Sequence, residues 1–165
     1  MDVVLLLAVA SVIVILLFDL TNGFHDASNM IATVVASRAM TPVQAVIVVG
    51  TFHFIGPLLG GTAVANTIGK FIDVSSLDVV VSLTIILCGL SGAILWNLLT
   101  WWFGIPSSSS HALVGGLIGA VVFASGTQHV VWGFSQLLEG ELTGVTKVIL
   151  ALVISPLIGF WVGFA

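Results

Sequence analysis

The residues best able to do chemistry in this chain are polar side chains that interrupt one of its most apolar stretches. They follow one another at intervals of three and four residues, which places them on one face of a helix. This polar stripe consists of Asp19, Asn22, Asp26, Asn29 and Thr33. A carboxylate at the centre of a bilayer costs about 2.5–3.5 kcal/mol on insertion scales, unless it is protonated or binds a cation. The stripe therefore predicts a cation site.

Asp26 is the strongest candidate in the stripe, and we expect Asn22 and Asn29 to complete the site. Carboxylate and amide oxygens are hard ligands, which suit Na⁺ or H⁺ better than a soft metal. Three neighbours are expected to support the site: Asp19, His25 and Thr33. The spacing of a zinc site is absent from the sequence, so we expect no metal other than Na⁺ and no cofactor. The alternative is that these groups only hold neighbouring helices together.

A second candidate site is the serine run PSSSSH, residues 106–111, which precedes the apolar segment ALVGGLIGA. Ser110 or Ser109 is well placed as the N-cap of a helix. Free amides at a helix start bind anions, and neighbouring hydroxyls add donors without adding charge. We therefore expect the serine run to bind an anion such as phosphate or sulfate. The alternative is that the serines only cap the helix.

The composition defines the elements that must position these residues. The chain has 165 residues, of which 59% are hydrophobic, and its mean hydropathy is +1.28. Only 6% are charged, against roughly 25% in an average soluble domain. The sequence therefore predicts an all-α, polytopic helical membrane protein. A net charge of −4 on so few groups predicts no nucleic-acid partner. Adjacent Ser110 and His111 point in different directions on a helix, which argues against a serine hydrolase; we expect no enzyme.

Six helices are expected, over residues 3–20, 24–37, 43–68, 79–103, 111–125 and 145–165. We expect a break at Asn22-Gly23, because an unbroken helix over 3–35 would be roughly 50 Å long, against a hydrocarbon core of about 30 Å. Glycine accepts the unusual dihedrals that such a break requires. The segment 111–125 is short for a membrane span and is expected to be re-entrant. Its glycines should admit a close neighbouring helix: Gly115, Gly116 and Gly119.

Two long motifs give the sequence a family resemblance. NGFHDASNMIATVVASRAMTP and GIPSSSSHALVGGLIGA resemble the two signatures of the PiT family of inorganic phosphate transporters, whose G-x-x-D-x-x-N core falls on Gly23, Asp26 and Asn29. The resemblance implies a symporter that moves phosphate with Na⁺ or H⁺. It assigns Asp26 and Asn29 to the substrate and ion site, where we expect Asn29 to bind phosphate as well as the cation. It also assigns Ser108, Ser109 and Ser110 to the phosphate cradle, with His111 behind them.

The resemblance also implies two inverted repeats, each with one copy of both motifs, whereas this chain holds a single copy. We therefore expect it to be one transmembrane repeat, spanning residues 1–165 and corresponding to the N-terminal half of a family member. Either it is a fragment, or two copies assemble in antiparallel orientation to complete the site. Membrane lipid and a second repeat or second copy are its expected partners. The expected location is the plasma membrane of a prokaryote.

The two candidate sites have opposite preferences, since one attracts a cation and the other an anion. A phosphate dianion beside Asp26 would be repelled unless a cation lay between them, which favours cation-coupled transport of inorganic phosphate. One alternative is a permease for sulfate or another oxyanion on the same scaffold, because hydroxyls and helix amides do not by themselves select phosphate. Another alternative, from a different class, is a passive channel or a non-transporting assembly subunit.

Overall fold

The computed structural model describes residues 2–60 and 72–164. Within these ranges four helices are long and apolar enough to cross a membrane: α1 (Val3–Ala36), α2 (Pro42–Gly60), α4 (Val79–Trp102) and α7 (Gly144–Phe164). The shorter elements are α5 (Ser109–Ser125), the 3₁₀ turn η1 (Thr127–His129) and α6 (Phe134–Leu138). An isolated antiparallel bridge joins Ile72 to Val130. The prediction of an all-α, polytopic helical membrane protein is confirmed.

The predicted break in the first helix is wrong. A single helix of 34 residues, α1, replaces the two segments expected over 3–20 and 24–37. Glycine inside a helix costs only about 1 kcal/mol relative to alanine, so Gly23 alone does not end it. The neighbouring hydroxyls are satisfied along the helix, where Thr21 donates to the carbonyl of Phe18 at 2.9 Å and Ser28 to that of His25 at 2.8 Å. The polar residues therefore lie within one continuous helix.

The other helices follow the expected positions with small differences. The segments expected over 79–103 and 145–165 are observed as α4 and α7, while the segment expected over 111–125 begins earlier, at Ser109. The segment expected over 43–68 is α2, which passes through Pro57 and is described to Gly60; the remainder lies outside the described residues. The re-entrant path of α5 and the single-repeat organisation stay predictions.

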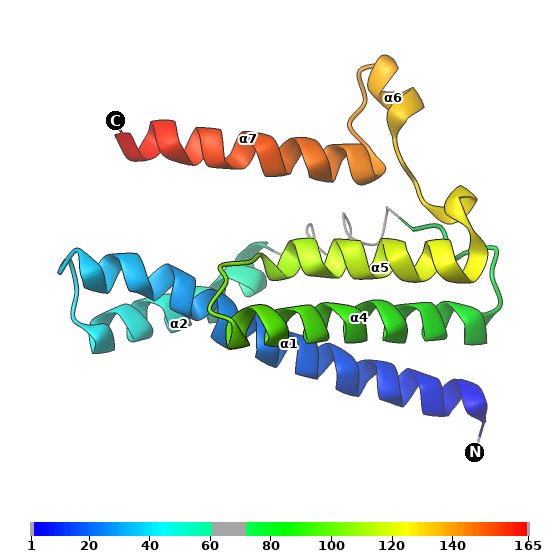
Figure 1. Ribbon diagram of the computed structural model, residues 1–165, viewed down its shortest axis with the longest axis horizontal. Coiled ribbons are helices and arrows are strands. Elements are labelled where there is room, and N and C mark those ends of the chain that lie inside the picture. Colours follow the sequence, from blue (N-terminus) through cyan, green and yellow to red (C-terminus); the bar gives the residue numbers. More distant parts are fainter. Residues whose placement is uncertain (1, 61–71, 165) are drawn as a thin grey trace.

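Helix α4 lies between α1 and α5 and packs against both (Figure 1). It runs beside α5 at backbone contact, where a Cβ added at Gly116 would overlap the carbonyl oxygen of Gly89. A Cβ at Gly89 would lie 3.0 Å from the Cα of Leu117. At Gly115 and Gly119, in contrast, an added Cβ would have no described neighbour within 4 Å. Of the three glycines expected at a helix contact, Gly116 alone makes the contact with α4.

Two apolar clusters hold this arrangement together. In one, Phe18 of α1 packs with Leu90 and Ala93 of α4. In the other, Ile85 of α4 and Val121 of α5 pack with residues near the start of α7. These clusters fix α1 and α5 on α4, and with them the two candidate sites.

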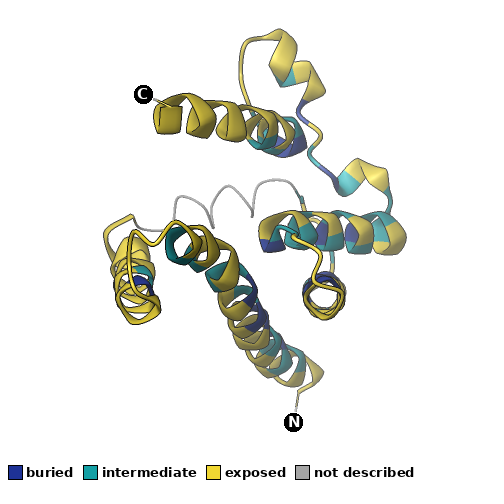
Figure 2. Ribbon diagram, turned by 60° about the vertical axis from the view of Figure 1, so that its left-hand side comes forward, coloured by how far each residue is buried: buried dark blue, intermediate teal, exposed yellow. Residues whose placement is uncertain are grey.

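Helices α2 and α7 are exposed along almost their whole length (Figure 2). Within the part of the chain that the structure describes, α2 buries only Ala45, and α7 buries only Gly144 and Val145 at its start. The exposed residues of both helices are largely apolar. Such faces contact lipid or other helices in a membrane protein.

Candidate functional site

The start of α5 is capped by Ser108. Its backbone is extended, and its Oγ accepts a hydrogen bond from the backbone N–H of His111 at 3.4 Å. The N-cap was expected at Ser110 or Ser109, so the helix starts earlier than predicted. The earlier start places Ser109 in the first turn, where its side chain turns inward and is fully buried. Ser110, next to it, is exposed.

The serine run meets the polar stripe at one contact. The hydroxyl of Ser109 donates a hydrogen bond to Oδ1 of Asp26, and the two atoms lie 3.2 Å apart. Ser109 is 0% exposed, whereas 33% of the Asp26 side chain is exposed. The carboxylate is therefore anchored on a buried hydroxyl and still reaches an open face. This contact joins residues 83 positions apart in the sequence.

His25 connects this contact to α4. Its Nδ1 lies 3.4 Å from Oδ1 of Asp26, and its Nε2 lies 3.3 Å from Oγ1 of Thr100. The ring is buried, with 4% of the residue exposed. The hydroxyl of Thr100 also lies 2.9 Å from the carbonyl oxygen of Trp96 and 3.2 Å from that of Asn97. A continuous polar path therefore runs from α4 through His25 to Asp26 and on to Ser109.

The rest of the polar stripe borders the packed face of α1. That face carries the buried residues Ser11, Phe18, Thr21 and His25. At about 100° per residue, the stripe is centred roughly 80° around the helix from it. In the structure Asn22 is half-buried, and three members are exposed: Asp19, Asn29 and Thr33. Asp26 is the member of the stripe that contacts the serine run in the described structure.

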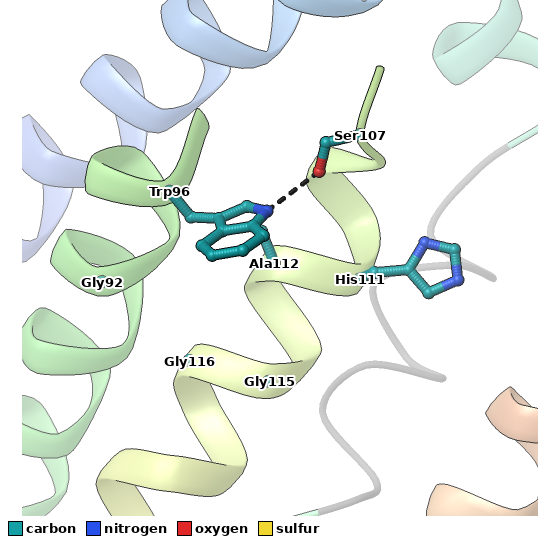
Figure 3. Close-up of a pocket in the computed structure, with 7 residues that line it drawn as sticks. All are labelled: Gly92, Trp96, Ser107, His111, Ala112, Gly115 and Gly116. Carbon is teal, nitrogen blue, oxygen red and sulfur yellow. Dashed lines mark hydrogen bonds between the residues drawn. The ribbon is translucent and has the colours of Figure 1, made fainter. Parts of the chain in front are cut away.

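Two cavities are lined by sequence neighbours of Asp26 and Ser109. A small one of about 160 Å³ is lined by His25, Asn29 and Thr100 together with the α4–α5 connection at residues 104–106. A larger one of about 480 Å³ lies between α4 and the start of α5. There the indole Nε1 of Trp96 donates to Oγ of Ser107 at 2.9 Å, and His111 points away from that bond (Figure 3). His111 therefore lines this cavity without taking part in that bond.

Sequence reasoning missed Asn97 and Thr100. Both are buried on α4, and Asn97 is 0% exposed with neither its Nδ2 nor its Oδ1 hydrogen-bonded in the described part of the chain. They stand three positions apart, on one helix face, within the apolar stretch AILWNLLTWW. Two polar residues at that spacing were an available signal for a buried polar contact.

Few side chains that could carry positive charge lie near the Asp26 carboxylate within the described ranges. His25 is the one potentially cationic side chain recorded within ion-pair distance of this carboxylate. A carboxylate in an apolar surrounding is stabilised by a bound cation or by a proton. The site can therefore accept positive charge on Asp26 while the start of α5, a few ångströms away, favours negative charge.

Secondary transporters commonly build their substrate and ion sites at helix termini inside the membrane. The sequence matches the phosphate transporter family over residues 22–165, and the chain belongs to that family. Membership makes it a transporter component and not an enzyme. The family and the four apolar helices together make it an integral membrane protein. Its bacterial relatives show that it is a prokaryotic one.

Three bacterial relatives illustrate the similarity. The chain is 44% identical over 160 residues to a probable low-affinity inorganic phosphate transporter of Streptomyces halstedii, covering 97% of this chain and 69% of that protein. It is 43% identical to the protein of the same description in Bacillus subtilis, covering 99% of this chain and 46% of that one. It is 40% identical to the low-affinity inorganic phosphate transporter PitB of Escherichia coli, covering 94% and 30%.

The chain thus spans less than half the length of the Bacillus and Escherichia relatives. No solved structure matches it.

Proposed function

We propose that this chain supplies one repeat of a secondary transporter that moves inorganic phosphate across a membrane together with Na⁺ or H⁺. The observation that carries the proposal is the hydrogen bond from Ser109 to Asp26, since it joins an anion-favouring helix start to a cation-favouring carboxylate. The family membership and the descriptions of the relatives support phosphate as the substrate.

Phosphate binds at the start of α5 in this proposal. The first N–H groups of a helix lack intrahelical partners and carry partial positive charge. The side chain of Ser108 binds the N–H of His111, which leaves the N–H groups of Ser109 and Ser110 for an anion. The exposed hydroxyl of Ser110 adds a donor. The hydroxyls of Ser108 and Ser109 also bind phosphate once they release the hydrogen bonds that they make to His111 and Asp26. Asn29 lies at the neighbouring cavity.

The coupling ion binds at Asp26. A carboxylate beside a phosphate dianion raises the energy of both, and a cation between them removes that repulsion. Asn22 and Asn29 stand one turn before and after Asp26, so their amide oxygens reach the same region. Binding of the cation therefore favours binding of phosphate and the reverse, which supports coupled transport of the two.

A second repeat or a second copy of the chain completes the site. Asp19, Asn29 and Thr33 are exposed on α1, yet polar groups at membrane depth need protein or water as partners. The Bacillus relative is long enough to contain a further repeat, because this chain spans 46% of its length. The exposed part of the stripe is the surface that the second repeat covers.

Replacing the phosphate-binding serines tests the anion site. In a full-length transporter carrying this segment, Ser109→Ala with Ser110→Ala is expected to raise the half-saturation concentration for phosphate by about tenfold or more, since two donors to a charged ligand are lost. Uptake of labelled phosphate into proteoliposomes measures it. Ser125→Ala, which removes a hydroxyl at the other end of α5, is the matched control. An unaltered affinity in the double variant would remove Ser109 and Ser110 from the phosphate site.

Competition and gradient experiments test the transported ion. Labelled phosphate uptake is measured in proteoliposomes with imposed Na⁺ or H⁺ gradients, and with sulfate or arsenate as competitors. We expect uphill uptake that collapses without the cation gradient and resists sulfate. Strong competition by sulfate would favour a general oxyanion permease. Uptake that never exceeds equilibrium would indicate a channel.

A further inference from the structure

We propose that Thr100 of α4 is a positioning residue, which holds the ring of His25 and thereby sets the Asp26 carboxylate against Ser109. The inference rests on the proposed function, because it concerns the same cation site. Thr100 does not contact Asp26 itself in the described structure; its hydroxyl lies 3.3 Å from Nε2 of His25, whose Nδ1 lies 3.4 Å from the carboxylate.

The geometry of the ring supports this role. Both nitrogens of His25 are engaged, one by α4 and one by Asp26, while the residue is only 4% exposed. A buried imidazole held at both nitrogens has a fixed ring orientation. Thr100 is equally buried, at 4% exposure, so water has little access to take its place. Loss of this hydroxyl would free the ring on the side of α4.

The hydroxyl suits either tautomer of His25. It has one hydrogen and two lone pairs, so it can accept from a protonated Nε2 or donate to a bare one. When it accepts, its own hydrogen remains on the carbonyl oxygen of Trp96, 2.9 Å away. Valine, which matches threonine in shape, can do neither. Serine retains the hydroxyl and loses only a methyl group.

A matched control exists on the same helix. The hydroxyl of Thr84 donates to the carbonyl oxygen of Val80 at 2.7 Å, the same type of bond that Thr100 makes with Trp96, but Thr84 is less buried and its bond lies on an exposed side of α4. Thr84→Val and Thr100→Val therefore each remove one such bond from α4. Only Thr100→Val also removes the partner of His25. A difference between the two variants isolates that contact.

Nitrogen NMR of the chain in lipid nanodiscs measures the contact directly. The full chain is labelled with ¹⁵N-histidine, and the signals of His25 are identified by their loss in His25→Gln. We expect Nε2 of His25 to show a hydrogen-bonded shift in the unaltered protein. Thr100→Val should move that signal, whereas Thr100→Ser and Thr84→Val should leave it in place. A free Nε2 in the unaltered protein would overturn the inference without any variant being needed, as would an unmoved signal in Thr100→Val.

Uptake kinetics then separate positioning from structure. In a full-length transporter, Thr100→Val is expected to raise the half-saturation concentration of the coupling cation about tenfold, as loss of a supporting partner does at ion sites. Thr100→Ser should restore it. A fall in maximal rate alone, with cation half-saturation unchanged, would show a merely structural role and overturn the inference. Absence of phosphate uptake in the unaltered protein would instead contradict the proposed function, while the NMR result would still decide whether Thr100 holds His25.

Discussion

Asp26→Asn is expected to abolish cation-coupled phosphate uptake, with a loss of at least about 100-fold, while membrane insertion stays intact. The substitution keeps the size of the side chain and an oxygen that can accept from Ser109, so the contact seen at 3.2 Å can persist. It removes the negative charge that attracts the cation, and a charge interaction at a partly desolvated site is worth several kcal/mol. Labelled phosphate uptake into proteoliposomes, with the amount of inserted protein measured in parallel, gives the comparison.

Asp78→Asn is the control for Asp26→Asn. Asp78 caps α4 by accepting from the N–H of Val80 at 2.8 Å, and asparagine caps a helix about as well as aspartate. This variant removes one carboxylate without touching the site, and its uptake should match that of the unaltered transporter. Normal uptake with unchanged cation dependence in Asp26→Asn would remove Asp26 from the coupling mechanism.

Gly116→Ala is expected to destabilise the packing of α4 on α5 by about 1–3 kcal/mol, the usual range for overpacking. The added Cβ would overlap the backbone carbonyl oxygen of Gly89, and backbone cannot move aside as a flexible side chain can. The two helices must therefore separate, which also withdraws Ser109 from Asp26. Thermal unfolding in detergent micelles measures the effect as a lower Tm.

Gly115→Ala is the matched control, since it makes the same chemical change one position earlier in α5. Among the described residues nothing lies within 4 Å of its added Cβ. Alanine also favours a helix over glycine by up to about 1 kcal/mol, so Tm should stay equal or rise. Equal losses in both variants would contradict the close approach at Gly116.

The helical membrane class followed from the sequence because composition alone excludes a soluble fold: 6% charged residues cannot cover a surface. The break at Asn22-Gly23 did not follow, because it was inferred from the length of the apolar run. Length does not determine whether a helix bends, tilts or projects from a membrane. In the structure the backbone stays helical through Asn22-Gly23, and the hydroxyls of Thr21 and Ser28 bond to carbonyls within the same helix.

The residues of the site could be predicted from their types, but the contacts between them could not. Asp26 and Ser109 stood out as polar residues in apolar surroundings, yet their hydrogen bond depends on how α1 and α5 are packed on α4. That packing places His25, expected only as a supporting residue, at the centre of the buried polar path. Thr100 was missed because a single hydroxyl near a run of tryptophans resembles an ordinary interfacial residue.

Because α1 is continuous, the surroundings of Asp26 differ between its two sides along the helix axis. Past Asp26 the helix continues over residues 27–36, about 15 Å at about 1.5 Å per residue, whereas the α4–α5 hairpin turns back at the level of Ser109. Figure 1 shows α2 and the end of α1 extending beyond that turn. On the other side of the turn, α4 and α5 are packed at backbone contact near Gly116. The proposed function therefore predicts that solutes reach Asp26 from the end where Arg38 follows α1, so that an arriving anion meets a positive charge before a negative one.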